Sequence, residues 1–358
     1  MQPEEQVALV RAVQSNCDIA DARHAADTTL CTYLLQMREF CRWQRGLGLS
    51  STLQRADVGD WIASRESLWD GLQAQAFGAL PLPGSGQAEP FDADGVNARL
   101  LPMGLLYGAG LVGAGRPVFF LAELHHQGRR DGLAVLQGGR EHARGLLAPV
   151  AALAGSGQGP VIVRRESLAR WGWERWEAFT LRPHEGSALH ALTQAYGFAA
   201  GFDQALPRWL EDQVELAVLH ELGEYRAGLR LGPRWEALLQ HLQGRRANAL
   251  ARAVRDHIAD LGHTLPQLLD RGADATLHGW FAAYDGHRQA LYPSLPAAYA
   301  AWRGGDGGRG LRAACERGSA HFETLAHQVL ALHGSLGDAA AAAVEQRLAA
   351  PAAVCPPA

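Results

Sequence analysis

The hydrophobic pattern of the chain is helical towards both ends and strand-like in the middle. Apolar residues recur every three or four positions over residues 4–45 and 53–77, the spacing of one buried helix face. We expect a break near Ser15 and Asn16, because this pair suits the start of a second helix at Cys17. Two apolar runs at 116–124 and 132–136, separated by glycine and charged residues, predict a pair of strands.

A helix over 140–152 and a short strand at 161–163 should follow, with Ser167 capping the next helix. From residue 188 the spacing is helical again, over 188–200, 207–228, 233–243, 246–270, 276–290 and 311–333. Pro266 predicts a kink near Gly262, because proline removes a backbone donor. The chain is therefore expected to be mainly α, a multi-helix bundle with a small inserted antiparallel β element, and α+β overall.

The same pattern predicts the organisation of the chain. Residues 1–78 should form an N-terminal helical portion, and the segment 79–98, rich in proline and glycine, should be a loop or linker. Residues 99–180 should hold the β-hairpin and a helix. Residues 181–350 should form a C-terminal helical bundle packed with the N-terminal helices, and 351–358 a disordered tail.

Composition narrows the class of protein. The 47% hydrophobic and 20% charged fractions are those of an ordinary globular protein, and a net charge of -4 without a basic stripe argues against a nucleic-acid partner. No apolar run approaches the roughly 20 residues that cross a bilayer, so no membrane partner is expected. Five scattered cysteines without CxxC spacing favour a reducing compartment, and the first residues lack the basic start of a secretory signal. A cytoplasmic location is the expectation.

The segment 214–224 carries the strongest candidate chemistry. His220 and Glu224 lie one turn apart on a helix face whose other residues are mostly small or apolar, and Glu221 lies between them. Charged groups on such a face must be paired, hydrogen-bonded or bound to a metal, because burying them alone is unfavourable. The alternative is a core histidine that pairs with a nearby carboxylate.

A second set lies on the helix expected over 246–270. Asp256, Asp260 and His263 share one face at helical spacing, and His257 points about a quarter turn away. The alternative is a salt-bridged face that uses neighbouring arginines at 252 and 255.

A third pair, Asp21 and His24, is three residues apart on the N-terminal helix. This carboxylate-x-x-histidine spacing occurs in the metal centres of helical bundles. The pair lies opposite the apolar stripe of its helix, so the alternative is a solvated polar face.

Imidazole and carboxylate groups on several helices are what a metal site in a bundle requires. We therefore expect a metal-dependent enzyme, a mono- or dinuclear non-haem iron or manganese oxidoreductase acting on a small molecule or dioxygen. Glu221 is the candidate catalytic residue, as a proton acceptor or an orienter of a ligand. The candidate metal ligands are His220, Glu224, Asp256, His257, Asp260, Asp21 and His24.

Zinc and haem are less favoured cofactors. His220 and Glu221 begin like the zinc-protease motif, but Glu224 stands where that motif has its second histidine. The competing class is a non-enzymatic helical scaffold or a cofactor carrier, including a haem protein, in which the same residues form buried ion pairs.

Along most of its length the chain resembles an uncharacterised family of bacterial cytoplasmic proteins. The resemblance rests on residues 17–24 (CDIADARH), the stretch 220–224 and the triplet 255–257. It implies a grouping and no mechanism, because the family has no established activity.

Overall fold

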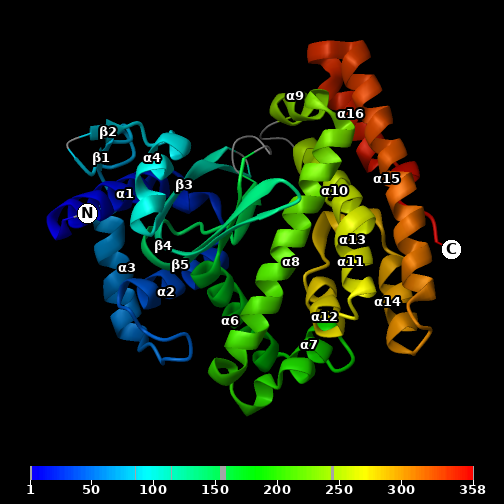
Figure 1. Ribbon diagram of the computed structural model, residues 1–358, viewed down its shortest axis with the longest axis horizontal. Helices are drawn as coiled ribbons and strands as arrows, with labels where there is room; N and C mark the ends of the chain where they lie inside the picture. The colour runs from blue at the N-terminus through cyan, green and yellow to red at the C-terminus, as the bar shows by residue number, and fades with distance from the viewer. Residues whose placement is uncertain (1, 85, 114, 154–158, 243–245, 358) are drawn as a thin grey trace. The chain divides into compact units, whose positions relative to one another are not determined.

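The computed structural model describes residues 2–84, 86–113, 115–153, 159–242 and 246–357. The chain divides into two compact units: unit 1 is Met1–Val150 with Ile162–Glu177, and unit 2 is Ala151–Val161 with Ala178–Ala358 (Figure 1). Helices predominate and the longer strands are antiparallel, so the mainly α, α+β fold class is confirmed.

Unit 1 combines helices with a sheet. Its helices are α1 (Pro3–His24), α2 (Leu30–Gln44), α3 (Arg55–Trp69), α4 (Ala93–Leu100) and the part of α6 (Arg165–Leu181) up to Glu177. Short 3-10 turns follow α1 and α4, at Ala25–Asp27 and Leu101–Met103. Its strands are β1 (Leu80–Leu82), β2 (Gly86–Ala88), β3 (Leu105–Val112), β4 (Arg116–Arg130), β5 (Leu133–Arg144) and β7 (Val161–Arg164), of which Val161 counts with unit 2.

The sheet of unit 1 is built on a long hairpin. β4 pairs antiparallel with β3 on one side and with β5 on the other, and β7 follows β5. Helix α1 packs across β4 and β5 (Figure 1). The apolar face of α1, with Leu9, Val13 and Cys17, is buried against Tyr107 and Phe119 of the sheet. The predicted pair of strands is therefore confirmed.

Unit 2 is a helical assembly. It contains β6 (Ala151–Leu153), α7 (Ala188–Tyr196), α8 (Phe202–Leu231), α9 (Pro233–His241), α10 (Arg246–Ala259), α11 (Leu265–Asp270), α12 (Asp274–Ala282), α13 (Gly286–Leu291), α14 (Leu295–Arg303), α15 (Arg309–Leu336) and α16 (Ala340–Ala349). One-turn 3-10 helices lie at Phe198–Ala200, Gly337–Ala339 and Pro351–Ala353. Its core gathers large buried side chains from α9 to α16, among them Trp235, Tyr292 and Phe322.

Where the sequence predicts a kink on the α10 segment, the structure has a π-helical turn. Residues Asp260–Thr264 follow α10 with wider winding, and the Leu265 N–H reaches back five residues to the Asp260 carbonyl. Pro266 begins the next helix, where a missing N–H does least harm. Turns of this kind are frequent at functional sites because they redirect side chains.

Two sequence predictions about the N-terminal half are wrong. Helix α1 runs through Ser15 and Asn16 without a break, because the Asn16 side chain bonds both backbone groups of Gly78 instead of capping a helix. The break falls after His24, and Thr29 caps α2. The segment expected as a helix over 140–152 continues β5 to Arg144, since its residues pair with β4.

Three further expectations differ from the structure. Ser167 does not cap α6, which starts at Arg165, because its hydroxyl donates to Glu141. The expected helix over 276–290 is divided into α12 and α13, and Gly286 at the junction has a positive φ of 59°. Where a disordered tail is expected after residue 350, the Cys355 N–H donates to the Leu291 carbonyl at 2.8 Å and the Cys355 side chain is buried.

Across the part of the chain that the structure describes, every helix is too short or too polar to span a membrane.

The contact between α8 and α10 is unusually close at Gly223. A Cβ atom built there would lie 2.8 Å from the Ala259 carbonyl oxygen, inside the closest normal contact. We expect Gly223→Ala to lower the free energy of unfolding by about 1 to 3 kcal/mol, because one of the two backbones must move. Urea unfolding followed by circular dichroism measures this.

Gly228→Ala on the same helix is the matched control. A Cβ atom there meets no atom within 4 Å, so alanine should stabilise the protein by roughly 0.5 to 1 kcal/mol through helix propensity alone. If Gly223→Ala also stabilises the protein, the two helices do not approach each other closely at Gly223, and the prediction is contradicted.

Candidate metal centre

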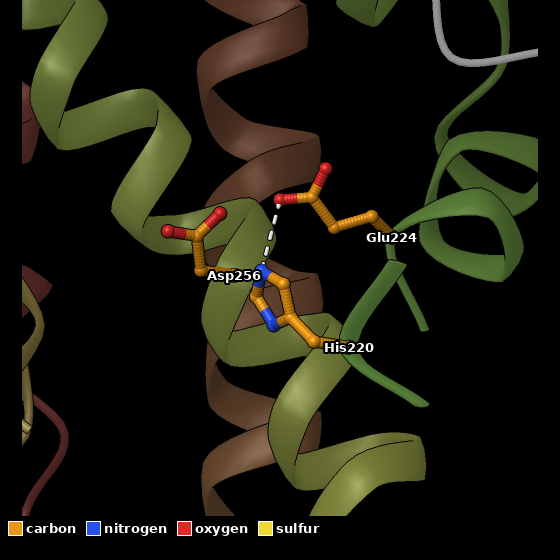
Figure 2. Close-up of side chains that lie close together, drawn as sticks. All are labelled: His220, Glu224 and Asp256. Atoms are coloured by element: carbon orange, nitrogen blue, oxygen red, sulfur yellow. Dashed lines mark ion pairs between the residues drawn. The ribbon is translucent and has the colours of Figure 1, made fainter. Parts of the chain in front are cut away.

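The best candidate site lies in unit 2 where α8 faces α10. His220 and Glu224 project from one face of α8, and Asp256 projects from α10 towards them (Figure 2). One donor atom from each of the three side chains lies within 4.8 Å of the other two. His220 Nε2 is 3.4 Å from Glu224 Oε1. The helical spacing of these residues, combined with the close packing of the two helices, brings them together.

Asp260 fixes the other side of the His220 ring. Its Oδ1 lies 2.8 Å from His220 Nδ1, and the carboxylate is completely buried in the π-helical turn. A buried carboxylate accepting from Nδ1 holds the imidazole in one orientation and directs Nε2 towards Glu224 and Asp256. Carboxylate–histidine pairs of this kind commonly stand behind metal ligands.

Two arginines complete the network around the cluster. Arg255 donates to Glu224 Oε1 at 2.7 Å and lies 3.8 Å from Asp256. Arg288 of α13 lies 3.4 Å from Asp260 and donates to the Ala283 carbonyl through its other terminal nitrogen. Arg255 belongs to the salt-bridged face that the sequence allows. Arg288 has no local sequence signal, because only the turn between α12 and α13 brings it to Asp260.

The charges of these groups depend on one another. Burial alone would lower the pKa of His220, but Asp260 and then Glu224 raise it well above its ordinary value. Burial opposes the ionised form of Glu224, yet Arg255 and then His220 hold the pKa of that carboxyl well below its usual range. Burial likewise opposes the charge of Asp260, and His220 and Arg288 lower its pKa. Without a bound ion, the ring is a cation between two carboxylates.

Two further carboxyl groups beside His220 and Glu224 have raised pKa values. Burial, followed by the charge of Glu224, raises the pKa of Asp256 to about 7 and that of Glu221 to about 8. Four acidic side chains therefore share a region with two arginines and one histidine.

The centre is partly open to solvent. The exposed fraction of the side chain is 26% for His220, 24% for Asp256 and 11% for Glu224. A small ion or molecule can therefore reach the three donor groups, whereas Asp260 behind them is fully covered.

His257 lies on α10 beside these residues but is turned away from the three donor groups. Its Nε2 lies 2.9 Å from the Arg288 carbonyl oxygen, and its ring stacks on Phe322 with centroids 4.2 Å apart. Burial lowers the pKa of His257 to about 4, so the ring is neutral at physiological pH. The structure gives this side chain a place in the core of unit 2.

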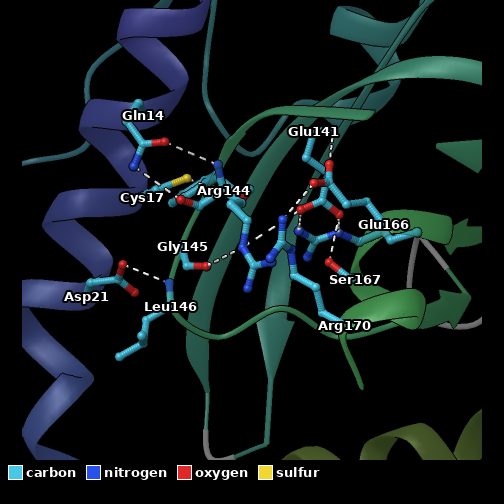
Figure 3. Close-up of polar contacts among 12 residues, drawn as sticks. Gln14, Cys17, Asp21, Glu141, Arg144, Gly145, Leu146, Glu166, Ser167 and Arg170 are labelled. Carbon is cyan, nitrogen blue, oxygen red and sulfur yellow. Dashed lines mark hydrogen bonds and ion pairs between the residues drawn. The ribbon is translucent and has the colours of Figure 1, made fainter. Parts of the chain in front are cut away.

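Asp21 and His24 belong to unit 1, while the other candidate residues belong to unit 2. Asp21 is buried and its Oδ2 accepts the Leu146 N–H at 2.8 Å (Figure 3). His24 Nδ1 lies 3.1 Å from Asp27. Both side chains line a cavity of about 30 Å³ with Thr28. That volume holds a water molecule or two. The His24 side chain is 34% exposed, as a solvated face predicts, whereas Asp21 is buried.

The fold and this cluster define a two-unit α+β protein with a histidine–carboxylate centre in its helical unit. The comparisons place the chain in a family. A model described as the N-terminal domain of a family of unknown function, DUF6866, matches residues 8–164, and the model of the C-terminal domain of the same family matches residues 169–351. The chain belongs to this family. Neither a curated protein nor a solved structure matches it.

Asp21 should make stability depend on pH. Burial is the main cause that raises its pKa to about 8, so the folded protein keeps a proton that the unfolded chain releases near pH 4. Between these values the unfolded state binds fewer protons, and stability falls as pH rises, by up to about 1.4 kcal/mol per pH unit from this group. Asp21→Asn should remove this pH dependence, because asparagine does not titrate. Its side-chain oxygen can still accept the Leu146 N–H, so the hydrogen bond is kept.

The measurement is urea unfolding of both proteins at several pH values from 5 to 8. The stability of the variant relative to the original should increase steadily with pH. Two parallel curves would show that Asp21 is ionised in the folded protein throughout.

Proposed function

We propose that unit 2 binds one divalent transition metal between His220, Glu224 and Asp256, and that the protein is a metal-dependent enzyme. The observation that carries the proposal is the convergence of three donor groups from two packed helices within 4.8 Å, with Asp260 positioned behind His220. A divalent ion there would replace the protons that His220 and Asp256 hold in its absence. Metal sites release protons in this way when they fill.

The donor set favours iron or manganese. One imidazole and two carboxylates are ligands that both ions accept, and three protein ligands leave coordination positions for a substrate. Dioxygen or a small molecule is the proposed partner of the ion, which makes an oxidoreductase the proposed type of enzyme. Glu221 is the proposed proton acceptor in its ionised form: it is buried within electrostatic reach of His220 and Glu224, and its pKa of about 8 makes it a strong base once its own proton has left.

Metal content is the direct test of the proposal. Protein purified without chelator should carry about one equivalent of iron or manganese, because a site with charged ligands retains its ion through purification. His220→Ala should reduce the content to less than about 0.1 equivalent, since it removes the only nitrogen donor of the three. Inductively coupled plasma mass spectrometry gives both values.

His278→Gln is the matched control for that test. His278 also lies on a helix of unit 2, where it contacts the Tyr299 hydroxyl at 2.8 Å and none of the three donor groups. The control should keep its metal. A metal-free original protein that also fails to bind added Fe²⁺ or Mn²⁺ would refute the proposal.

Asp260 is expected to act as a positioning residue. Asp260→Asn removes the negative charge that orients the His220 ring, and second-shell changes of this kind lower metal affinity by roughly 10- to 100-fold. Titration with Mn²⁺ followed by electron paramagnetic resonance measures the change. A purely structural role for Asp260 would lower the melting temperature and leave the affinity of the folded protein unchanged.

A non-enzymatic scaffold is the second candidate, and the arginine contacts favour it. Arg255 and Arg288 already neutralise Glu224 and Asp260, and such ion pairs can fix the register of packed helices. The metal titration separates the two candidates. A scaffold would show no saturable metal binding and a large loss of stability in Arg255→Met.

A further inference from the structure

Unit 1 contains a second group of buried charges that is unlike the first. Arg144 of β5, Arg164 of β7 and Arg170 of α6 are each no more than 6% exposed. Two carboxylates, Glu141 and Glu166, accompany them. Figure 3 shows Arg144 and Arg170 reaching from their separate elements towards these carboxylates.

Both carboxylates already have partners. Glu141 accepts two hydrogen bonds from Arg164, at 2.9 and 2.8 Å, and a third from the Ser167 hydroxyl at 2.7 Å. Glu166 accepts the Glu141 backbone N–H at 2.6 Å and Arg170 Nη2 at 2.9 Å. Neither carboxylate accepts a hydrogen bond from Arg144.

The guanidinium groups, by contrast, have N–H donors that lack an acceptor. Nη1 of Arg144, Nη1 of Arg164 and both Nε and Nη1 of Arg170 are buried with no hydrogen-bond partner among the described residues. A buried donor without an acceptor is destabilising by roughly 1 to 3 kcal/mol, and more when it is charged. These donors indicate an acceptor that the protein itself does not provide.

The three arginines also act on one another electrostatically. Burial first, and then the charges of Arg164 and Arg170, lower the pKa of Arg144 in spite of Glu141. The carboxyl of Glu174 is also in range of Arg144 and Arg170, and burial followed by the charge of Glu39 raises its pKa.

We propose that the cluster of Arg144, Arg164 and Arg170 binds a phosphate group. The planar guanidinium fork matches the oxygens of a phosphate, and a tetrahedral anion offers enough acceptors for donors that arrive from three different elements. Inorganic phosphate and a small phosphate monoester carry the same group. This site lies in unit 1 and does not depend on the metal proposed in unit 2.

The test uses the complete chain with inorganic phosphate as the probe, in buffer with chelator. Thermal unfolding should shift upwards in a saturable way, by roughly 3 °C or more at about 10 mM phosphate relative to chloride at equal ionic strength. Phenyl phosphate in a parallel series distinguishes the free ion from a monoester: a larger shift with either probe identifies the source. Equal shifts with phosphate, acetate and chloride would overturn the proposal.

Variants make the test specific to the cluster. Arg170→Met should abolish the phosphate shift, measured relative to the melting temperature of the variant itself in chloride, because this change leaves Glu166 without its ion-pair partner and also lowers stability in phosphate-free buffer. Arg170→Lys, which keeps the charge and loses the fork, should weaken phosphate binding at least tenfold in calorimetry. A phosphate shift that survives both changes would overturn the proposal.

Arg65→Met is the matched control. Arg65 is an equally buried arginine of unit 1, but its donors reach Asp18 at 3.0 Å and Gln44 at 2.6 Å. This variant should be less stable than the original and should keep the full phosphate shift. Loss of the shift in Arg65→Met as well as in Arg170→Met would assign the effect to general destabilisation.

Discussion

The architecture of unit 2 depends on the close approach of α8 and α10 at Gly223. Only a residue without a side chain fits against the Ala259 carbonyl. Because the helices meet there, the residues on either side of Gly223 face the other helix directly, and His220 and Glu224 meet Asp256 and Asp260 across the gap. Charged groups this close together and away from solvent must pair with groups of opposite charge, and they form the observed network of ion pairs.

Helical periodicity predicted much of this site. The face shared by His220 and Glu224, and the face shared by Asp256 and Asp260, follow from spacing alone, and the structure brings both faces together. The role of Arg288 and the burial of His257 against Phe322 depend on how separate helices pack, which spacing does not encode. In the same way, the residues over 140–144 have helical spacing, but pairing with β4 decides their conformation.

The buried charged clusters of the two units differ in composition. In unit 2 acidic groups outnumber the cations, and Asp256 and Glu221 remain protonated as a consequence. In unit 1 three buried arginines come together, and some of their guanidinium N–H groups have no acceptor among the described residues. A metal ion at the first cluster would displace protons from its histidine and carboxyl groups, and an anion at the second would give the remaining N–H groups acceptors.

The same reasoning weighs against a purely structural role for the histidine centre. Ion pairs that serve only to hold helices together gain most when they are complete, and replacing them with apolar residues is often neutral or stabilising. Here one side of the cluster is partly open: His220 and Asp256 keep about a quarter of their side-chain surface exposed, while Asp260 behind the ring is fully covered and paired. Asp260, on the covered side, orients the imidazole ring, and the donor atoms of His220 and Asp256 lie on the exposed side. Binding a small ion requires both features, because a ligand residue must be held in position by a second residue and must also be accessible to the ion.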